Sequence, residues 1–215
     1  MMQWKRYAET PAFVREHFQK QAVSFDGLYE DDSLLQRTIR PGLFQRRKAA
    51  MDLVRRCDHP LVLDVGCGSG RVAESILEVG VKGYVGVDFS EPMLELAGQR
   101  LQRFGQLVTL RQGNFLELPF DTTFDVILGL GLFDYVEEPD RFTRRMRELS
   151  RGWVYATFPR WNWYKGVVRH IRYRVINRCP IYDYTERELR FLFKGSGFDD
   201  VQIDVRRNGF AVLAR

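Results

Sequence analysis

The segment from Val62 to Arg71, VLDVGCGSGR, constrains the fold of this chain more than any other segment does. Apolar residues lead up to Asp64, and glycines follow at positions 66, 68 and 70 before a helical pattern begins. Glycine permits a tight turn and a close approach of the backbone to a ligand, because it has no Cβ atom. A buried strand, a glycine turn and a helix together predict a nucleotide-type pocket in an α/β fold. Taken alone, the segment is also compatible with a plain strand-to-helix turn.

The spacing of these glycines narrows the choice of ligand. A dinucleotide-binding fingerprint has its glycines at the first, third and sixth positions, whereas here the third glycine comes one residue early and an arginine holds the sixth position. The order Asp64-x-Gly66-x-Gly68-x-Gly70 instead resembles motif I of the class I methyltransferases, which use S-adenosylmethionine. The resemblance implies that this loop, with Cys67 in it, passes along the methionine part of the cofactor.

A second buried-strand pattern ends at Asp88, 24 residues beyond Asp64. An acidic residue at this distance can accept hydrogen bonds from both ribose hydroxyls of an adenosine. Methyltransferases and NAD enzymes share this feature, so it supports an adenosine ligand without separating the two. Resemblance to the family implies that Phe89 and Met93 flank the adenine. A helix N-cap is the other role open to Asp88, but Ser90 suits that role better.

Two further segments resemble the family in the expected order. The third strand pattern leads into residues 113–115, where the family commonly has Gly-Asp and an apolar residue, and where the acid takes the adenine amino group. Asn114 can still accept through its carbonyl oxygen. The fourth strand opens with Phe124-Asp-Val-Ile, a common start of motif IV. The resemblance therefore adds Gly113, Asn114, Phe115, Gly129 and Leu130 to the expected cofactor site.

The segment after the fourth strand bears on the methyl acceptor. Enzymes that methylate amino groups of nucleic-acid bases usually have Asn/Asp-Pro-Pro-aromatic there, whereas this chain has Gly-Leu-Gly-Leu, so nucleic acid is disfavoured as a partner. Many small-molecule O-methyltransferases have a histidine in the next segment, where this chain has Asp134 and Tyr135. We expect these two as catalytic residues, the carboxylate taking a proton and the phenol orienting the acceptor. Transfer by alignment alone is the alternative, because the sulfonium leaving group is already activated.

The whole chain predicts one α/β domain over residues 1–215. Its 215 residues, 45% of them hydrophobic, can bury one sizeable core. We expect a Rossmann-like, seven-stranded, mostly parallel sheet with helices on both faces and an antiparallel C-terminal hairpin that turns at Asn208-Gly209. An NAD-binding domain would have a parallel sixth strand instead. The expected parts are a helical lid (1–57), a cofactor-binding core (58–158), an insertion (159–184), and a C-terminal helix with the hairpin (185–215).

The lid and the insertion are the parts expected to meet the substrate. Tyr29, Arg37 and Arg40 in the lid are candidates to face the cofactor carboxylate or an anionic substrate, although each also suits a solvated helix position. The insertion opens with Trp161 and Trp163 and continues as an apolar helical stripe flanked by arginines. Such a stripe is typical of a helix in a membrane interface. A cap over the substrate pocket and a surface for nucleic acid are the other interpretations.

The cysteines and the net charge bear on metal binding, cellular location and partners. The cysteines at positions 57, 67 and 179 are odd in number and lack metal-ligand spacing, so we expect no metal site and a reducing, cytoplasmic location. The longest apolar stretch, residues 126–133, is too short to span a membrane. The net charge of +5 favours anionic partners, including peripheral contact with an anionic membrane. The oligomeric state stays open.

These features together predict an S-adenosylmethionine-dependent methyltransferase that releases S-adenosylhomocysteine. The expected acceptor is an O, N or C nucleophile of a small molecule, with amphiphilic and anionic molecules as the favoured kinds. An RNA methyltransferase, a nicotinamide oxidoreductase and a non-catalytic protein that binds S-adenosylmethionine are the alternatives.

Overall fold

The computed structural model describes residues 41–160, 182–206 and 209–215. In chain order the elements are α3 (Pro41–Arg55), β1 (Leu61–Val65), α4 (Arg71–Val79), β2 (Gly83–Asp88), α5 (Glu91–Leu101), the 3-10 segment η1 (Gln102–Leu107), β3 (Val108–Gln112), β4 (Phe124–Gly129), α6 (Pro139–Leu149), β5 (Ser150–Pro159), α8 (Glu186–Gly195), β6 (Val201–Arg206) and β7 (Gly209–Ala214).

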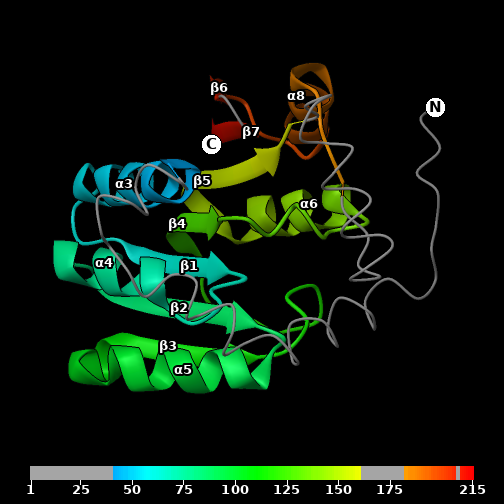
Figure 1. Cartoon of the computed structure of the whole chain (residues 1–215). Coiled ribbons are helices and arrows are strands. Elements are labelled where there is room, and N and C mark those ends of the chain that lie inside the picture. The colour runs from blue at the N-terminus through cyan, green and yellow to red at the C-terminus, as the bar shows by residue number, and fades with distance from the viewer. Residues whose placement is uncertain (1–40, 161–181, 207–208) are drawn as a thin grey trace.

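A seven-stranded sheet in the order β3-β2-β1-β4-β5-β7-β6 forms the centre of the molecule. Figure 1 shows the strands in this order, from β6 at the top to β3 at the bottom. Strands β1 to β5 pair in parallel, and β7 pairs antiparallel with both β5 and β6. The chain proceeds outward from β1 in one direction and from β4 in the other, so the topological switch point, where α/β sheets of this kind bind ligands, lies at the carboxyl ends of these two strands. This topology confirms the predicted fold class, including the C-terminal hairpin.

Helices cover both faces of the sheet. On one face α3, α4 and α5 pack onto the strands through Ala50, Leu53, Val54, Ala73, Ile76, Leu77 and Leu101. On the other face α6 and α8 contribute Met146, Leu149, Leu189 and Phe193. The connection from β3 to β4, residues 113–123, contains no helix. There Phe115 fills the core instead, with its ring centroid 6.2 Å from that of Phe120 and 5.7 Å from that of Phe142.

Helix α3 at the start of the described chain and helix α8 near its end can be compared with the sequence prediction. The buried apolar residues of helix α3 pack in the same cluster as those of α4. Helix α3 therefore belongs to the layer of helices that covers this face of the sheet. The lid predicted for residues 1–57 stays a prediction, because residues 1–40 lie outside the described part of the chain. Helix α8 begins with a capping box: the Thr185 hydroxyl accepts from Glu188 N, and Glu188 Oε2 accepts from Thr185 N.

The hairpin turn lies slightly earlier than the sequence predicted. Gly209 is the first residue of β7, paired with Arg206 and Pro159, rather than a turn residue. A Cβ atom at Gly209 would lie 2.4 Å from the carbonyl oxygen of Phe158, so the close approach of β5 explains this glycine. Asn208, the other residue of the predicted turn, lies outside the described residues.

Candidate active site

The glycine loop joins β1 to α4 at the carboxyl edge of the sheet. Gly66, Gly68 and Gly70 have φ angles of +77°, +54° and +77°, which L side chains rarely adopt. The amides of Gly66 and Cys67 donate to the carbonyl oxygen of Val87 at 2.8 and 3.1 Å, which ties the loop to the end of β2. A Cβ atom at Gly68 would meet no heavy atom within 4 Å, so the middle of the loop borders open space.

Asp88, the last residue of β2, connects the other parts of the site. Its Oδ2 accepts from Gly68 N and its Oδ1 from Ser90 N, both at 2.9 Å, while its backbone oxygen accepts from Gly113 N at 3.0 Å. Burial raises the pKa of Asp88, and the backbone amides of Ser90, Gly68 and Phe89 act against that rise. Each carboxylate oxygen has more than one acceptor position, so both can still take a hydrogen bond from a ligand hydroxyl.

Ser90 plays a different part from the predicted one. It occupies the N-cap position of α5, but its hydroxyl makes no capping hydrogen bond. The Ser90 Oγ atom is buried and has no hydrogen-bond partner among the described residues. Ser90 therefore takes the N-cap position as predicted, but its hydroxyl does not cap the helix and is left for another partner beside Asp88.

Asp64, near the end of β1, and Cys67, within the glycine loop, are both buried. Asp64 is 2% exposed, and its Oδ2 accepts from the Tyr84 hydroxyl at 2.8 Å. Burial raises the pKa of Asp64 to about 7, against the effect of the Tyr84 hydrogen bond and with a smaller contribution from Asp88. Burial likewise raises the pKa of the Cys67 thiol. A Cβ atom at Gly86 would lie 2.9 Å from Cys67 Sγ, so the thiol packs directly onto that glycine.

The residues predicted to meet the adenine surround the same edge. Met93 is buried on α5, and Phe89 is half-buried directly after Asp88. Asn114 organises the turn after β3: its Oδ1 accepts from Leu116 N at 3.1 Å, and its side-chain nitrogen donates to Glu117 at 2.7 Å. Adenine contacts by these residues, and by Phe115 in the adjacent core, stay predictions.

The segment expected to serve the methyl acceptor begins where β4 ends. A Cβ atom at Gly129 would lie 3.0 Å from the Met146 methyl group, so this end of β4 packs tightly; Leu130 follows it and is partly buried. Gly131 has a φ angle of +76°, and its amide donates to Thr157 Oγ1 at 3.0 Å. These contacts fix the backbone after β4 against the end of β5.

Asp134 and Tyr135 follow in a turn closed by a hydrogen bond from Tyr135 N to Leu132 O at 3.1 Å. The backbone oxygen of Asp134 accepts from Tyr182 N at 3.0 Å, which brings the chain before α8 to this segment. Burial raises the pKa of Tyr184, and the nearby Asp134 carboxylate adds to the rise. The sequence did not point to Tyr184, because nothing in its local pattern indicates that α8 starts beside the end of β4.

Several expected site residues cannot be placed. Tyr29, Arg37, Arg40, Trp161 and Trp163 all lie outside the described residues. Over the described ranges, no three His, Cys, Asp or Glu side chains gather closely enough to hold a metal ion. No helix in these same ranges is long and apolar enough to cross a membrane.

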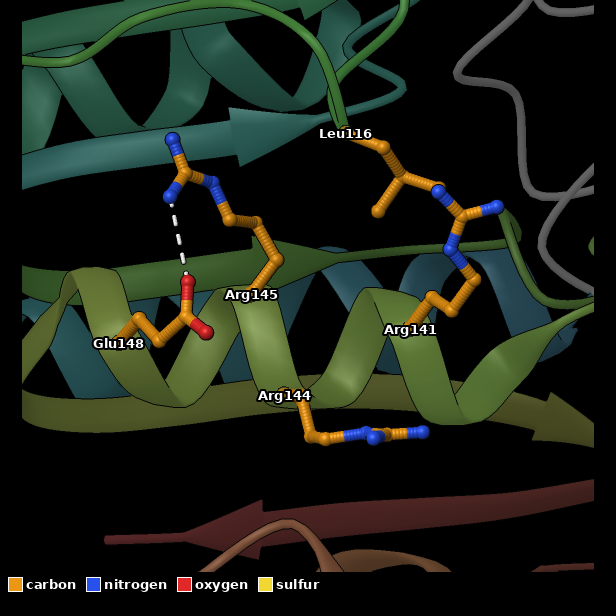
Figure 2. Close-up of a pocket in the computed structure, with 5 residues that line it drawn as sticks. All are labelled: Leu116, Arg141, Arg144, Arg145 and Glu148. Atoms are coloured by element: carbon orange, nitrogen blue, oxygen red, sulfur yellow. Dashed lines mark hydrogen bonds and ion pairs between the residues drawn. The ribbon is translucent and has the colours of Figure 1, made fainter.

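A hollow beside α6 lies apart from the glycine loop. It is lined by Leu116, Arg141, Arg144, Arg145 and Glu148 (Figure 2). Arg145 pairs with Glu148 at 3.2 Å, Arg141 pairs with Glu138 at 2.7 Å, and Arg144 pairs with Asp140. Since these arginines already have acidic partners on an exposed helix face, the hollow is a solvated ion-pair surface rather than a cofactor site.

Comparison with known proteins finds methyltransferases among the chains similar to this one. A family model described as "Methyltransferase domain" matches residues 62–152. A demethylmenaquinone methyltransferase of Lactiplantibacillus plantarum is 29% identical over 72% of this chain and 77% of its own length. A protein of the same name from Symbiobacterium thermophilum is 34% identical over 67% of this chain, which spans only 57% of that relative.

Solved structures show the same fold at low sequence identity. Magnesium protoporphyrin IX methyltransferase from Synechocystis, with bound S-adenosylmethionine, superposes with a TM-score of 0.76 at 19% identity over 98% of both chains. The 1,6-didemethyltoxoflavin-N1-methyltransferase of Burkholderia thailandensis has a TM-score of 0.71 at 20% identity, over 100% of this chain and 92% of that one. The loop, the sheet order and the family model together make this chain a class I S-adenosylmethionine-dependent methyltransferase.

Proposed function

We propose that the protein transfers the methyl group of S-adenosylmethionine to a small molecule, with Asp88 and the Gly66–Gly70 loop as the cofactor cradle. The observation that carries this proposal is the convergence of Gly68 N, Ser90 N and Gly113 N on Asp88. The bonds from Gly68 N and Ser90 N orient the carboxylate before a ligand arrives, which lowers the cost of binding, and the bond from Gly113 N holds the backbone of Asp88. The open space at Gly68 and the unpartnered Ser90 hydroxyl both suit a polar ligand at this edge.

The other predicted residues have roles consistent with that cradle. Phe89, Met93 and Asn114 would enclose the adenine, with Gly113 and Phe115 shaping that side of the pocket. Asp64 and Cys67 would hold the loop in place. When bound, the cofactor supplies an activated methyl group on a sulfonium. The backbone at Gly129 and Leu130 would then border the methionine part.

The segment after β4 would serve the acceptor. Asp134 would receive the proton that the attacking nucleophile loses, and Tyr135 would orient that nucleophile toward the methyl carbon. The expected lid (residues 1–57) and insertion (residues 159–184) would close over the site and exclude water, which protects the reaction from hydrolysis.

The acceptor we favour is a small molecule with an apolar body or an acidic group. Two relatives carry the name demethylmenaquinone methyltransferase, which indicates a quinone-type acceptor as the first to test. The net charge of +5 agrees with an anionic acceptor, or with peripheral contact between the arginine-flanked insertion and an anionic membrane. Methylation of RNA and binding of the cofactor without turnover remain the competing functions.

The test uses S-adenosylmethionine labelled on its methyl group, incubated with the purified protein and a whole-cell extract. We expect enzyme-dependent label in the organic-soluble or aqueous small-molecule fraction. Label in RNA would overturn the acceptor class, and cofactor binding without any label transfer would favour the non-catalytic reading. Asp88→Asn should abolish the label. Asp58→Asn, on an exposed side chain, serves as the matched control.

A further inference from the structure

Tyr155 carries a buried hydroxyl that neither the fold nor the cofactor cradle uses. It lies on β5, on the face covered by α3, and is 5% exposed. Its oxygen is buried and makes no hydrogen bond of standard geometry among the described residues, although the Arg206 side chain interacts with it. A polar group in this state destabilises the folded protein unless a ligand or water completes it.

Arg206 approaches this hydroxyl from the edge strand β6. Its Nε donates to Asp204 Oδ2 at 2.9 Å, whereas its Nη1 is buried and without a partner in the described structure. Strand β7 lies between β5 and β6, and its residues in this region are the small Gly209 and Ala211. Their size leaves room for the long arginine side chain to extend across β7 toward Tyr155.

Arg46 approaches the same region from α3. Its Nη1 would lie 3.1 Å from a Cβ atom at Gly131, so this guanidinium touches the backbone directly after β4. The amide of Gly131 in turn binds Thr157, two residues beyond Tyr155 on β5. Burial raises the pKa of Tyr155, while the positive charge of Arg206, its hydrogen-bonding interaction with the hydroxyl, and the positive charge of Arg46 act to lower it.

The three side chains make an incomplete electrostatic arrangement. The guanidiniums of Arg46 and Arg206 approach the same region. Among the described residues, the acid that forms an ion pair with either of them is Asp204, which pairs with Arg206. Burying like charges together is unfavourable unless an anion joins them. Guanidinium groups match carboxylate and phosphate oxygens through parallel N–H donors, and the Tyr155 hydroxyl, protonated at neutral pH, adds a further donor.

We propose that Arg46, Arg206 and Tyr155 bind the carboxylate or phosphate group of the methyl acceptor. The site lies beside Gly131, two residues after Gly129, and therefore next to the segment where the methyl group would be delivered. The assignment to the acceptor rests on the proposed methyltransferase function, whereas the anion site itself rests on the geometry of the three side chains. The acceptor class that follows is an acidic small molecule.

The first experiment measures binding of inorganic phosphate by calorimetry to the full chain saturated with S-adenosylhomocysteine. We expect wild type to bind phosphate, and Arg206→Gln and Tyr155→Phe each to weaken binding about tenfold, the effect of losing one charge-assisted hydrogen bond. Arg144→Gln is the matched control, because that arginine pairs with Asp140 on the exposed face of α6. Equal phosphate binding by all four proteins, or none by wild type, would overturn the site.

Two further measurements distinguish a loss of phosphate binding from a loss of folding, and an acceptor site from an unrelated anion site. Tyr155→Phe removes a buried hydroxyl that makes no hydrogen bond of standard geometry, so its melting temperature without phosphate should equal or exceed that of wild type, and lost binding is then not lost folding. In the labelled-extract assay, phosphate should inhibit methyl transfer by wild type and by Arg144→Gln. Phosphate binding without such inhibition would overturn the assignment to the acceptor. If wild type does not bind S-adenosylhomocysteine, that result counts against the methyltransferase function. The anion site is then judged from the phosphate-binding measurement by itself.

Discussion

At the scale of single residues, the site depends on carboxylates held in different surroundings. The Asp88 carboxylate accepts hydrogen bonds from two backbone amides at the rim of the glycine loop, whereas the buried Asp64 carboxylate accepts one from the Tyr84 hydroxyl. Backbone amides favour the ionised form of a carboxylate, and burial disfavours it. These differences decide which carboxylate is available to a ligand and which one responds to pH.

Asp64 should make the stability of the protein depend on pH near neutrality. Its pKa rises from 3.8 to about 7 on folding, mainly through burial. Between these values the folded state binds more protons than the unfolded state, so the free energy of unfolding falls as the pH rises from about 4 to about 7. The loss is at most about 4 kcal/mol. Asp64→Asn should therefore be more stable than wild type at pH 8, and the gain should shrink toward pH 4.

Thermal unfolding of both proteins from pH 4 to pH 8.5 measures this effect. The exposed Asp58→Asn variant corrects for the general change in charge. A difference between Asp64→Asn and wild type that does not vary with pH would contradict the titration of this carboxyl group.

Asp134→Asn tests whether methyl transfer needs a general base. If the carboxylate takes a proton from the acceptor, the turnover rate should fall about 10²- to 10⁴-fold, while the affinity for S-adenosylhomocysteine should stay unchanged, because Asp134 lies beyond the cofactor cradle. Initial rates with the identified acceptor, measured against pH, provide the check. An unchanged turnover rate would instead favour transfer by alignment.

At the scale of elements, the glycine loop combines two different requirements for glycine. Gly70 has positive φ and also packs against α5, where a Cβ atom would lie 3.1–3.3 Å from atoms of Leu101 and Ala97. Gly68 also has positive φ, but the space at its Cβ position is open. The first glycine therefore serves helix packing, and the second faces the expected ligand.

Alanine at each position should separate these requirements. Gly70→Ala should lower the free energy of unfolding by about 2–3 kcal/mol, through backbone strain and overpacking. Gly68→Ala should cost only about 1–2 kcal/mol of strain and yet weaken binding of S-adenosylhomocysteine at least as much as Gly70→Ala does. Urea unfolding and calorimetry give the two quantities. A reversed order of stability would show that the loop is not clamped by α5.

The elements were predictable to different degrees, for identifiable physical reasons. The glycine spacing and the strand-end acids predicted the β1–α4 loop and Asp88, because these features repeat over short distances along the chain. The position of Gly209 was missed, since the carbonyl group that excludes a side chain there belongs to Phe158, which lies 51 residues earlier in the chain. Arg46, Tyr155 and Arg206 could not have been grouped from the sequence, because they lie on α3, β5 and β6 and meet only through the strand order.

At the scale of the whole molecule, the sheet has two halves that meet between β1 and β4. Strands β1, β2 and β3 carry the loop, Asp88 and Gly113, while β4 and β5 carry the expected acceptor side. The two halves are joined along β1 and β4, over the short register from Val62 to Asp64. A ligand that contacts both carboxyl edges should therefore stabilise the molecule as one unit.

S-adenosylhomocysteine at 100 times its dissociation constant should raise the free energy of unfolding by about 2.7 kcal/mol. For a chain of this size the melting temperature should then rise by about 5–10 °C. Asp88→Asn should largely remove this shift, because the amide offers one acceptor oxygen where the carboxylate offers two. Asp58→Asn should keep it. Scanning fluorimetry over a range of ligand concentrations measures the rise. If the Asp88 variant shifts as much as wild type, then the cofactor is held by the loop backbone and not by the strand-end acid.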